Sequence, residues 1–363
     1  MRRSCCLGSL ALVACGRIGF DSIAGDAGVV VAATDANYAF VSTTQVAPGA
    51  LGGLGGADAI CNSDAANARL PGTYVAWLST STTNAVDRLA GARGWVRLDG
   101  KPIADQATDI AAWNAIEPIA FDALARPVAE LVTTTSANDG TFVGDACDDL
   151  TQPVDSILAL EGRSDATGAL LSSADAHGCD LAMPLFCFGI DRVQPVGVPP
   201  PTAGKLLFVS SFWSPGGGVT DADAHCASDA QAAGATGAFL AWLSTSAQPA
   251  STRFSAASGP IVRPDGVVVA RDVAALAAGT LDTAPNVTLA RTYTSTSVWS
   301  GGVTPSLAGS ASSSCQDWTS SAPSELGDTG LAELGDPGYF GDADILDDST
   351  CNNGIVALYC LEQ

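Results

Sequence analysis

The segment Ala76-Trp77-Leu78-Ser79-Thr80-Ser81 recurs later in the chain as Ala241-Trp242-Leu243-Ser244-Thr245-Ser246. Two further runs repeat in the same order: Ala57-Asp58-Ala59-Ile60-Cys61 with Ala222-Asp223-Ala224-His225-Cys226, and Val96-Arg97-Leu98-Asp99-Gly100 with Val262-Arg263-Pro264-Asp265-Gly266. Composition alone does not produce ordered matches of this kind. The chain therefore contains two copies of one unit, and we expect both copies to share one fold.

A proline-rich stretch separates the copies. We expect copy 1 at residues 39–191, a linker at 192–204 and copy 2 at 205–363. The linker includes Gln194-Pro195-Val196-Gly197-Val198-Pro199-Pro200-Pro201, a composition that favours an extended, semi-rigid spacer over packed structure. A length of 363 residues accommodates two domains of ordinary size. The sequence thus predicts two modules in tandem, joined by an extended linker.

The charge balance excludes one large class of functions. The chain has 16 Lys and Arg against 38 Asp and Glu, which gives a formal net charge of −22. A protein that binds nucleic acid by neutralising phosphates needs a basic surface, so nucleic acid is not an expected partner. The hydrophobic content of 47% is sufficient for packed cores, so the acidity does not indicate a disordered chain.

The N-terminus has the pattern of an export signal. Met1-Arg2-Arg3 is basic and a short apolar stretch follows. Leu12-Val13-Ala14-Cys15 resembles the bacterial lipobox, which implies that residues 1–14 are a signal peptide and that Cys15 carries a lipid. An ordinary secretory signal with a chance cysteine is the alternative. The apolar stretch is too short to span a bilayer, which needs about 20 residues.

The resemblance to a lipoprotein also implies a location. Residues 15–38 form the lipidated tether in this interpretation, and the membrane is a partner through the lipid anchor alone. Gly16 follows the cysteine, where the family retains its inner-membrane members with Asp. We therefore expect the bacterial outer membrane, on its periplasmic or extracellular face.

The cysteines after Cys15 fall four to each copy: Cys61, Cys147, Cys179 and Cys187, then Cys226, Cys315, Cys351 and Cys360. An even number of cysteines in an exported protein predicts disulfides. Zinc is the competing interpretation, but neither copy has the close Cys-x-x-Cys pair typical of structural zinc sites. Four cysteines allow three pairings, and spacing alone does not choose among them.

Local patterns place the first cysteine of each copy on a helix. Residues 57–68 carry apolar or small side chains at helical spacing, so Cys61 should face the core. In copy 2 we expect Thr220 to cap the equivalent helix. The apolar runs at 74–78 and 239–243 predict short buried strands.

These features together resemble the C-type lectin-like fold, and within it the endostatin branch more than the sugar-binding lectins. More closely, the chain resembles an uncharacterised bacterial domain of surface lipoproteins allied to that fold. The residues that carry the resemblance, besides the repeated runs, are Phe40-Val41-Ser42, Gly52-Gly53-Leu54-Gly55-Gly56, Cys315-Gln316-Asp317-Trp318-Thr319-Ser320 and Leu358-Tyr359-Cys360. Copy 1 departs from the pattern at Cys147-Asp148-Asp149-Leu150.

The resemblance implies an α+β fold with two tandem C-type lectin-like domains. Each domain would have short mixed or antiparallel sheets, one or two helices and two disulfides, with the first cysteine paired to the fourth and the second to the third. The implied disulfides are Cys61 with Cys187, Cys147 with Cys179, Cys226 with Cys360, and Cys315 with Cys351.

Calcium is the one cofactor that the sequence brings into consideration. The sugar-binding motifs of the lectins are not intact here, because Glu117-Pro118-Ile119 has an apolar residue where an amide belongs. An acidic cluster could still supply the oxygen ligands that calcium prefers. Its members are Asp342, Asp344, Asp347 and Asp348. The ordinary interpretation of such a cluster is a solvated acidic surface.

No motif in the sequence indicates catalysis. The chain has only two histidines, His177 and His225, at positions that are not equivalent in the two copies, and neither belongs to a recognisable nucleophile motif. We expect a non-enzymatic, lipid-anchored cell-surface protein that binds a glycan or protein ligand through lectin-like loops. The alternative is a structural envelope lipoprotein that acts as a spacer without a discrete ligand.

Overall fold

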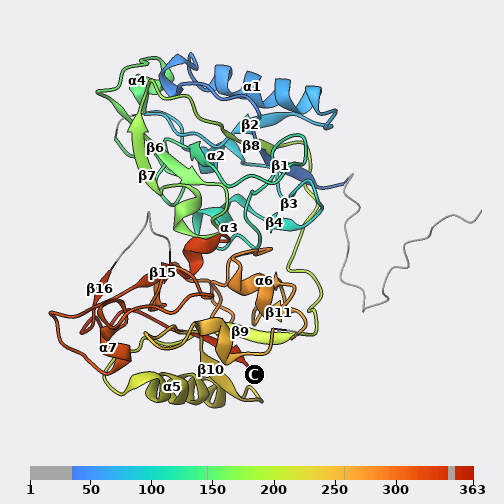
Figure 1. Ribbon diagram of the computed structural model, residues 1–363. Helices are drawn as coiled ribbons and strands as arrows, with labels where there is room; N and C mark the ends of the chain where they lie inside the picture. Colours follow the sequence, from blue (N-terminus) through green and yellow to red (C-terminus); the bar gives the residue numbers. More distant parts are fainter. Residues whose placement is uncertain (1–34, 145, 257, 342–347) are drawn as a thin grey trace, which may run out of the picture.

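The computed structural model describes residues 35–144, 146–256, 258–341 and 348–363 (Figure 1). The expected signal peptide, Cys15 and most of the tether lie outside these ranges. No helix within the described ranges has the length and apolar character that crossing a membrane requires.

Both copies mix α and β, with several small sheets and few helices, and the order of their elements is similar but not identical. Copy 1 contains β1 (Asn37–Val41), α1 (Leu54–Asn67), β2 (Tyr74–Ala76), α2 (Ala85–Arg88), β3 (Trp95–Val96), β4 (Pro102–Ala104), α3 (Ala107–Ala111), β5 (Leu131–Thr133), α4 (Cys147–Leu150), β6 (Leu158–Arg163), β7 (Asp175–Gly178) and β8 (Phe186–Gly189).

Copy 2 contains β9 (Lys205–Val209), α5 (Gly218–Ala232), β10 (Phe239–Ala241), β11 (Ile261–Val262), β12 (Val268–Ala270), α6 (Val273–Ala277), β13 (Ser297–Trp299), α7 (Cys315–Trp318), β14 (Leu326–Gly327), β15 (Thr329–Leu331), β16 (Ser349–Thr350) and β17 (Tyr359–Glu362). Short 3-10 turns lie at Pro48–Ala50, Ala169–Leu171, Ala250–Arg253, Ala311–Ser313 and Pro337–Tyr339.

Each copy is built on a five-stranded sheet with its first and last strands side by side. The strand order is β2-β8-β1-β3-β4 in copy 1 and β10-β17-β9-β11-β12 in copy 2. The first and last strands run antiparallel, with Phe40 opposite Cys187 and Phe208 opposite Cys360. The two ends of each copy therefore meet in the middle of its sheet.

The long helix of each copy is joined to the last strand by a disulfide. Cys61 on α1 bonds to Cys187 on β8, and Cys226 on α5 bonds to Cys360 on β17. All four cysteines are fully buried, as the helical spacing predicted for Cys61. Closing a loop of more than a hundred residues contributes about 4 to 5 kcal/mol in the chain-entropy model.

The second pair of disulfides closes a left-handed turn in each copy. Cys147 bonds to Cys179 and Cys315 bonds to Cys351, so the disulfides have the pairing that the resemblance implies. The four residues of α4 and of α7 all have positive φ, from 49° to 68°. This conformation costs roughly 1 to 2 kcal/mol per residue without glycine. Its occurrence in both copies shows that the turn is a built feature of the unit.

The repeated Ser-Thr-Ser run explains how the turn is held. The backbone N–H and hydroxyl of Ser81 donate to the carboxylate of Asp149 on α4. Ser246 donates in the same way to Asp317 on α7. These charge-assisted hydrogen bonds, together with the disulfide, offset the strain of the turn.

The Asp of the Ala-Asp-Ala-x-Cys run on the helix forms an ion pair. Both carboxylate oxygens of Asp58 accept from Arg88 Nη2 at 2.6 Å, and Asp58 Oδ1 also accepts the N–H of Ala76. Asp223 and Arg253 repeat the arrangement in copy 2. The pair ties the helix to the strand that follows it, which accounts for the spacing of the two repeated runs.

One local expectation is wrong. Helix α5 begins at Gly218, after Gly217 as its N-cap, so Thr220 lies within the first turn and does not cap the helix. Gly218 has a φ of 77°, which a residue with a side chain rarely adopts. The glycine turn, which pattern reasoning passed over, sets the start of the helix.

The expectation that an extended linker separates the two copies is also wrong. Figure 1 shows the two copies lying directly against each other, copy 1 above copy 2, with the linker beside them. One continuous hydrophobic core includes buried residues of both copies, among them Ile103 and Leu171 from copy 1 and Val269 and Leu334 from copy 2. The linker is therefore not a spacer that holds the copies apart.

We predict that Arg88→Met lowers the free energy of unfolding by about 2 to 3 kcal/mol, because Asp58 is left without its partner. The expected loss of stability is smaller than for a fully buried ion pair, because the side chain of Asp58 is 27% exposed. Urea unfolding is the measurement. The exposed Arg69 provides the control, and Arg69→Met should change stability by less than about 0.5 kcal/mol. Equal losses in the two variants would contradict the prediction.

Candidate functional site

The repeated Val-Arg-x-Asp-Gly run forms the junction between the copies. In copy 1 the Arg97 guanidinium donates to both carboxylate oxygens of Asp99, and in copy 2 Arg263 does the same to Asp265. Each turn thus holds its arginine in a fixed, forked geometry. Both arginines are nearly inaccessible to water, with exposures of 4% and 1%.

Each arginine also reaches into the other copy. Arg97 Nη1 donates to the carbonyl of Asp282 at 3.3 Å, and Arg263 Nη2 donates to the carbonyl of Ile116 at 3.2 Å. At the spacing that aligns Arg97 with Arg263, Ile116 aligns with Asp282. The two contacts are therefore equivalent, and the copies are related by an approximate two-fold axis.

The backbone confirms the two-fold relation. Ala166 and Leu334 form an antiparallel bridge, in which Thr167 N–H donates to the carbonyl of Glu333 at 3.0 Å. Gly335 N–H returns a hydrogen bond to the carbonyl of Asp165 at 2.8 Å. Chain segments of the two copies thus pair with each other as neighbouring strands do.

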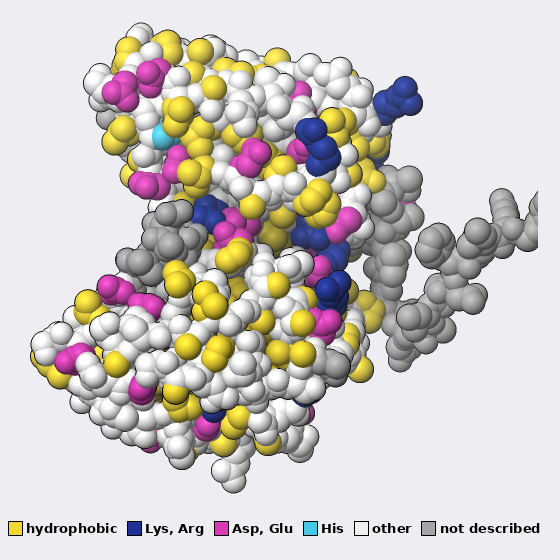
Figure 2. Space-filling view, in the orientation of Figure 1, with side chains coloured by type: hydrophobic (Ala, Val, Ile, Leu, Met, Phe, Trp, Pro, Cys, Tyr) yellow, Lys and Arg dark blue, Asp and Glu magenta, His cyan; other side chains and the backbone are white. Residues whose placement is uncertain are grey.

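A groove of about 770 Å³, here called the junction groove, lies along this contact. Figure 2 shows basic and acidic side chains side by side at the waist between the two copies. The groove is lined from copy 1 by Arg97, Asp99, Lys101, Pro118, Ala120, Phe121, Pro127, Val128, Ala129 and Asp165, and from copy 2 by Gly279, Thr280, Leu281, Asp282, Gly335, Asp336 and Pro337.

Two ion pairs at the junction groove join the two copies. Lys101 Nζ lies 3.4 Å from Asp282 Oδ2, and both side chains are partly exposed. Arg163 binds Asp165 of its own copy and Asp336 of the other. Burial and the neighbouring Asp165 carboxylate raise the pKa of Asp336. The two carboxyl groups therefore compete for one arginine.

Glu117 is a buried carboxyl group of the junction that contacts Arg97. Its side chain is 2% exposed, and Arg97 Nη1 is 3.4 Å from Glu117 Oε2. Burial raises the pKa of Glu117 to about 7, while Arg97, Lys101 and Arg263 act in the opposite direction and Asp282 reinforces the shift. The carboxyl group therefore changes its charge near neutral pH.

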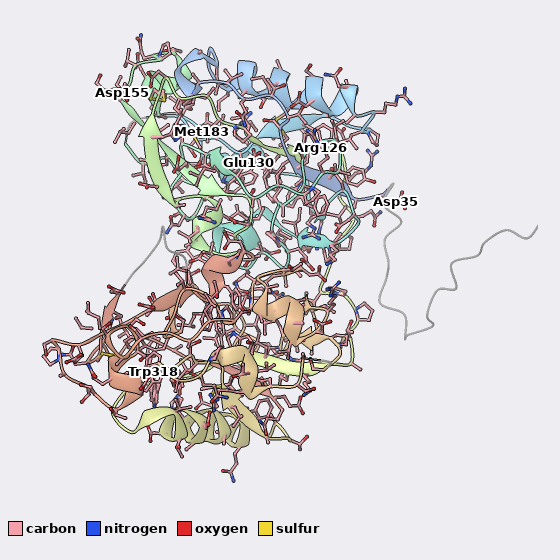
Figure 3. All side chains as sticks on the ribbon, viewed as in Figure 1. Asp35, Arg126, Glu130, Asp155, Met183 and Trp318 are labelled. Atoms are coloured by element: carbon pink, nitrogen blue, oxygen red, sulfur yellow. A yellow bond between two sulfur atoms is a disulfide. The ribbon has the colours of Figure 1, made fainter. Side chains whose placement is uncertain are left out.

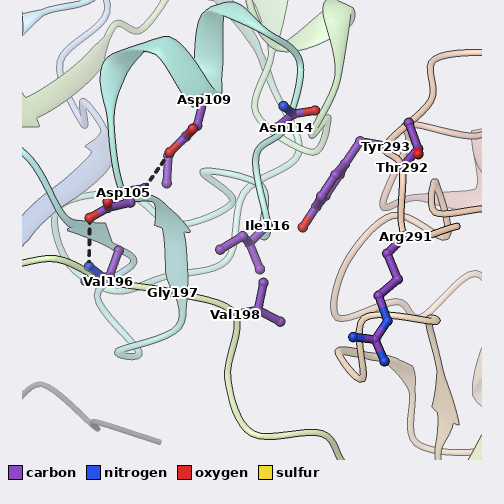
Figure 4. A pocket seen from close by; sticks show the side chains of 11 residues that line it. Asp105, Asp109, Asn114, Ile116, Val196, Gly197, Val198, Arg291, Thr292 and Tyr293 are labelled. Atoms are coloured by element: carbon purple, nitrogen blue, oxygen red, sulfur yellow. Dashed lines mark hydrogen bonds between the residues drawn. The ribbon is translucent and has the colours of Figure 1, made fainter.

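A second cleft, here called the linker cleft, lies between α3 and a loop of copy 2 and has a volume of about 480 Å³ (Figure 4). The linker itself forms one wall. Val196 N–H donates to Asp105 Oδ1, and Asp109 accepts the N–H of Asp105. The remaining lining residues are Ala104, Asn114, Ile116, Gly197, Val198, Arg291, Thr292 and Tyr293.

The two clefts occupy related positions about the two-fold axis. Tyr293 of the linker cleft aligns with Pro127 of the junction groove, and each belongs to a bridge in its own copy, Val287 with Tyr293 and Phe121 with Pro127. Residues 114 and 116 of the linker cleft correspond to 280 and 282 of the junction groove. The linker lines one cleft and not the other.

The structure describes only part of the predicted calcium site. Asp342, Asp344 and Asp347 lie outside the described residues. Burial and a hydrogen bond with Asp348 raise the pKa of Asp328. In the part of the chain that the structure describes, no three acidic, histidine or cysteine side chains converge as metal ligands do. Calcium binding stays a prediction.

Both histidines form local contacts. His177 is buried with its Nδ1 atom 2.9 Å from Glu161 Oε2, and burial lowers the pKa of His177 and raises that of Glu161, which favours neutral forms of both. His225 lies beside Ser211 and Asp229. Asp229 accepts from the backbone and hydroxyl of Ser211. This is not the order of a catalytic triad, in which the carboxylate orients the histidine.

The comparisons with known proteins add no relative: no protein-family model and no curated protein matches the chain. The candidate site therefore rests on the geometry of the junction. Sequence reasoning found the Val-Arg-x-Asp-Gly repeat but did not find its role. The repeated arginine within this otherwise apolar and turn-forming run was an available signal, but the run does not say which surface the arginine contacts.

We predict that stability falls as the pH rises from 4.5 to about 7 and that Glu117→Gln removes the part of this fall that comes from Glu117, while Asp336 and Asp328 keep theirs. The folded state raises the pKa of Glu117 from 4.5 to about 7, so its contribution is complete below pH 4.5 and is lost by the time the pH exceeds 7. The difference is on the order of 3 kcal/mol. Urea unfolding of both proteins between pH 5 and 8 provides the measurement, and parallel pH profiles would contradict the prediction.

We also predict that Arg263→Met lowers the free energy of unfolding by about 3 to 5 kcal/mol, because it leaves Asp265 and several buried acceptors without a donor. Arg263→Lys should recover little, since an ammonium lacks the forked geometry. The control is Arg271→Met, because the side chain of Arg271 is 81% exposed. A loss below 1 kcal/mol at position 263 would show that the junction does not depend on this arginine.

Proposed function

We propose that the protein is a lipid-anchored cell-surface binding protein that holds a glycan or protein ligand in the junction groove. The observation that carries the proposal is the groove itself, which takes its walls from both copies. Ligand sites in proteins are typically concave and mostly apolar, with a few placed polar groups. The junction groove has this composition, with prolines and Phe121 between its charged pairs.

The walls of the groove are held in place before a ligand arrives. The Arg97 guanidinium lies 4.9 Å above the centre of the Phe121 ring and is fixed by Asp99. The backbone bridge between Ala166 and Leu334 fixes the distance between the copies. A preformed site binds more tightly than one that must be ordered, because less conformational entropy is lost on binding.

The finer description of the fold belongs to the same proposal. Each copy is assigned to the C-type lectin-like fold, which is supported by the adjacent first and last strands and by the first-to-fourth disulfide. The lipid at Cys15 and the outer-membrane location rest on the Leu12-Val13-Ala14-Cys15 run. The binding role itself does not follow from the fold, because one fold serves many functions.

A spacer without a ligand is the second candidate. The observation that favours it is the continuous core, in which the two copies pack against each other. A rigid body at the end of a tether can separate other envelope components without binding any of them.

The test is a binding screen of the purified full chain on arrays of bacterial-envelope glycans and of peptides. We predict at least one specific ligand whose binding Phe121→Ala weakens about tenfold or more. Phe212→Ala is the control, because Phe212 is 56% exposed and is not part of the groove. Equal binding by both variants would place the ligand elsewhere, and an absence of binding on every array would favour the spacer.

A further inference from the structure

We propose that the ligand of the junction groove is an extended peptide that contains proline and a basic side chain. This inference rests on the proposed function and narrows it from a glycan or protein to one chemical class. Three observations carry it: the related cleft that the linker lines, the prolines of the groove and the charge of its rim.

The chain itself shows what the related cleft accepts. The linker passes the linker cleft as a segment without helix or strand, and Val196, Gly197 and Val198 form part of its lining (Figure 4). Prolines precede and follow these three residues, which keeps the segment extended. The main chain of this segment is held by a hydrogen bond from Val196 N–H to Asp105 Oδ1. The cleft therefore receives an extended, proline-flanked chain against a carboxylate.

The junction groove offers the related surface without such a segment. Pro127 takes the place of Tyr293, and Asp282 takes the place of Ile116, so the groove has a carboxylate where the linker cleft is apolar. The junction groove is also larger, about 770 Å³ against about 480 Å³. A second extended chain, the peptide ligand from another molecule, can therefore lie along the junction here.

The apolar part of the groove suits a peptide in the polyproline conformation. Pro118, Phe121 and Pro127 come from copy 1, and Leu281 and Pro337 come from copy 2. Recognition of proline-rich peptides uses shallow grooves of aromatic and proline side chains, because the ligand is already extended and loses little entropy on binding. The junction groove supplies these side chains from both of its walls.

The rim of the groove favours a positive charge on the ligand. Four carboxylates line it, Asp99, Asp165, Asp282 and Asp336, and three cations, Arg97, Lys101 and Arg163, pair with them. Arg97 directs its donors to protein acceptors, whereas the side chain of Asp282 is 51% exposed. The net charge of −22 adds long-range attraction for a cation. A basic side chain of the ligand would therefore replace Lys101 beside Asp282.

The experiment uses the full chain and a fluorescent decapeptide with the sequence of residues 192–201, Arg-Val-Gln-Pro-Val-Gly-Val-Pro-Pro-Pro. We expect saturable binding by fluorescence anisotropy at low salt. Replacing the peptide's arginine by glutamate should weaken binding at least fivefold, and this change does not affect the folding of the protein. Raising the salt concentration should weaken the binding of the arginine peptide and not the binding of the glutamate peptide.

Protein variants locate the site. Asp282→Lys should weaken the arginine peptide at least fivefold and improve the glutamate peptide. Asp155→Lys is the charge-matched control, because Asp155 lies at the end of copy 1 that is remote from the junction (Figure 3). Circular dichroism and thermal unfolding of each variant exclude a loss of fold as the cause of weaker binding.

The outcomes separate this inference from the proposed function. Equal loss in Asp282→Lys and Asp155→Lys, or equal binding of both peptides, would overturn the inference. Glycan binding that Phe121→Ala abolishes, with no peptide binding, would overturn the inference and leave the proposed function standing. Crosslinking of the groove to residues of the chain's own N-terminal segment would also overturn it, since that segment would then be the occupant.

Discussion

Two buried arginines that must satisfy their hydrogen-bond donors are the constraint on which the rest of the structure depends. Within its own copy, each of Arg97 and Arg263 has a carboxylate two residues away, which satisfies one edge of the guanidinium. The other edge reaches a carbonyl of the opposite copy. A buried guanidinium without these acceptors would carry a large desolvation penalty, so the copies are stable against each other in one arrangement.

The two-fold arrangement explains why the junction carries the candidate site. A two-fold contact between equivalent surfaces generates its features in pairs, so the junction has two related clefts. A single linker has to cross from one copy to the other, and it can line only one of them. Duplication of the unit, followed by close packing of the copies, thus leaves one of the two clefts open. The walls of this open cleft come from both copies, and its residues can differ from those of the linker cleft.

Features that depend on local sequence pattern or on the number of cysteines could be predicted from the sequence. The two copies, the disulfide-bonded cysteines and the helix around Cys61 follow from spacing and periodicity, and the structure has them. The junction did not follow, because its contacts join residues far apart in the chain and no local signal reports which turn faces which. A proline-rich composition indicates an extended linker, yet it does not say whether the flanking units touch. Thr220 does not cap its helix, because the helix begins two residues earlier, at a glycine turn in which Gly218 has a positive φ.

The most direct test of the junction is amide hydrogen exchange at Thr167 and Gly335, whose N–H groups donate across the two-fold axis to the other copy. If the copies form one body, both amides exchange as slowly as those of the central strands β1 and β9, because exchange then requires the junction to open. Exchange of these two amides at the rate of exposed loops, while the strands stay protected, would show two independent modules and contradict the account.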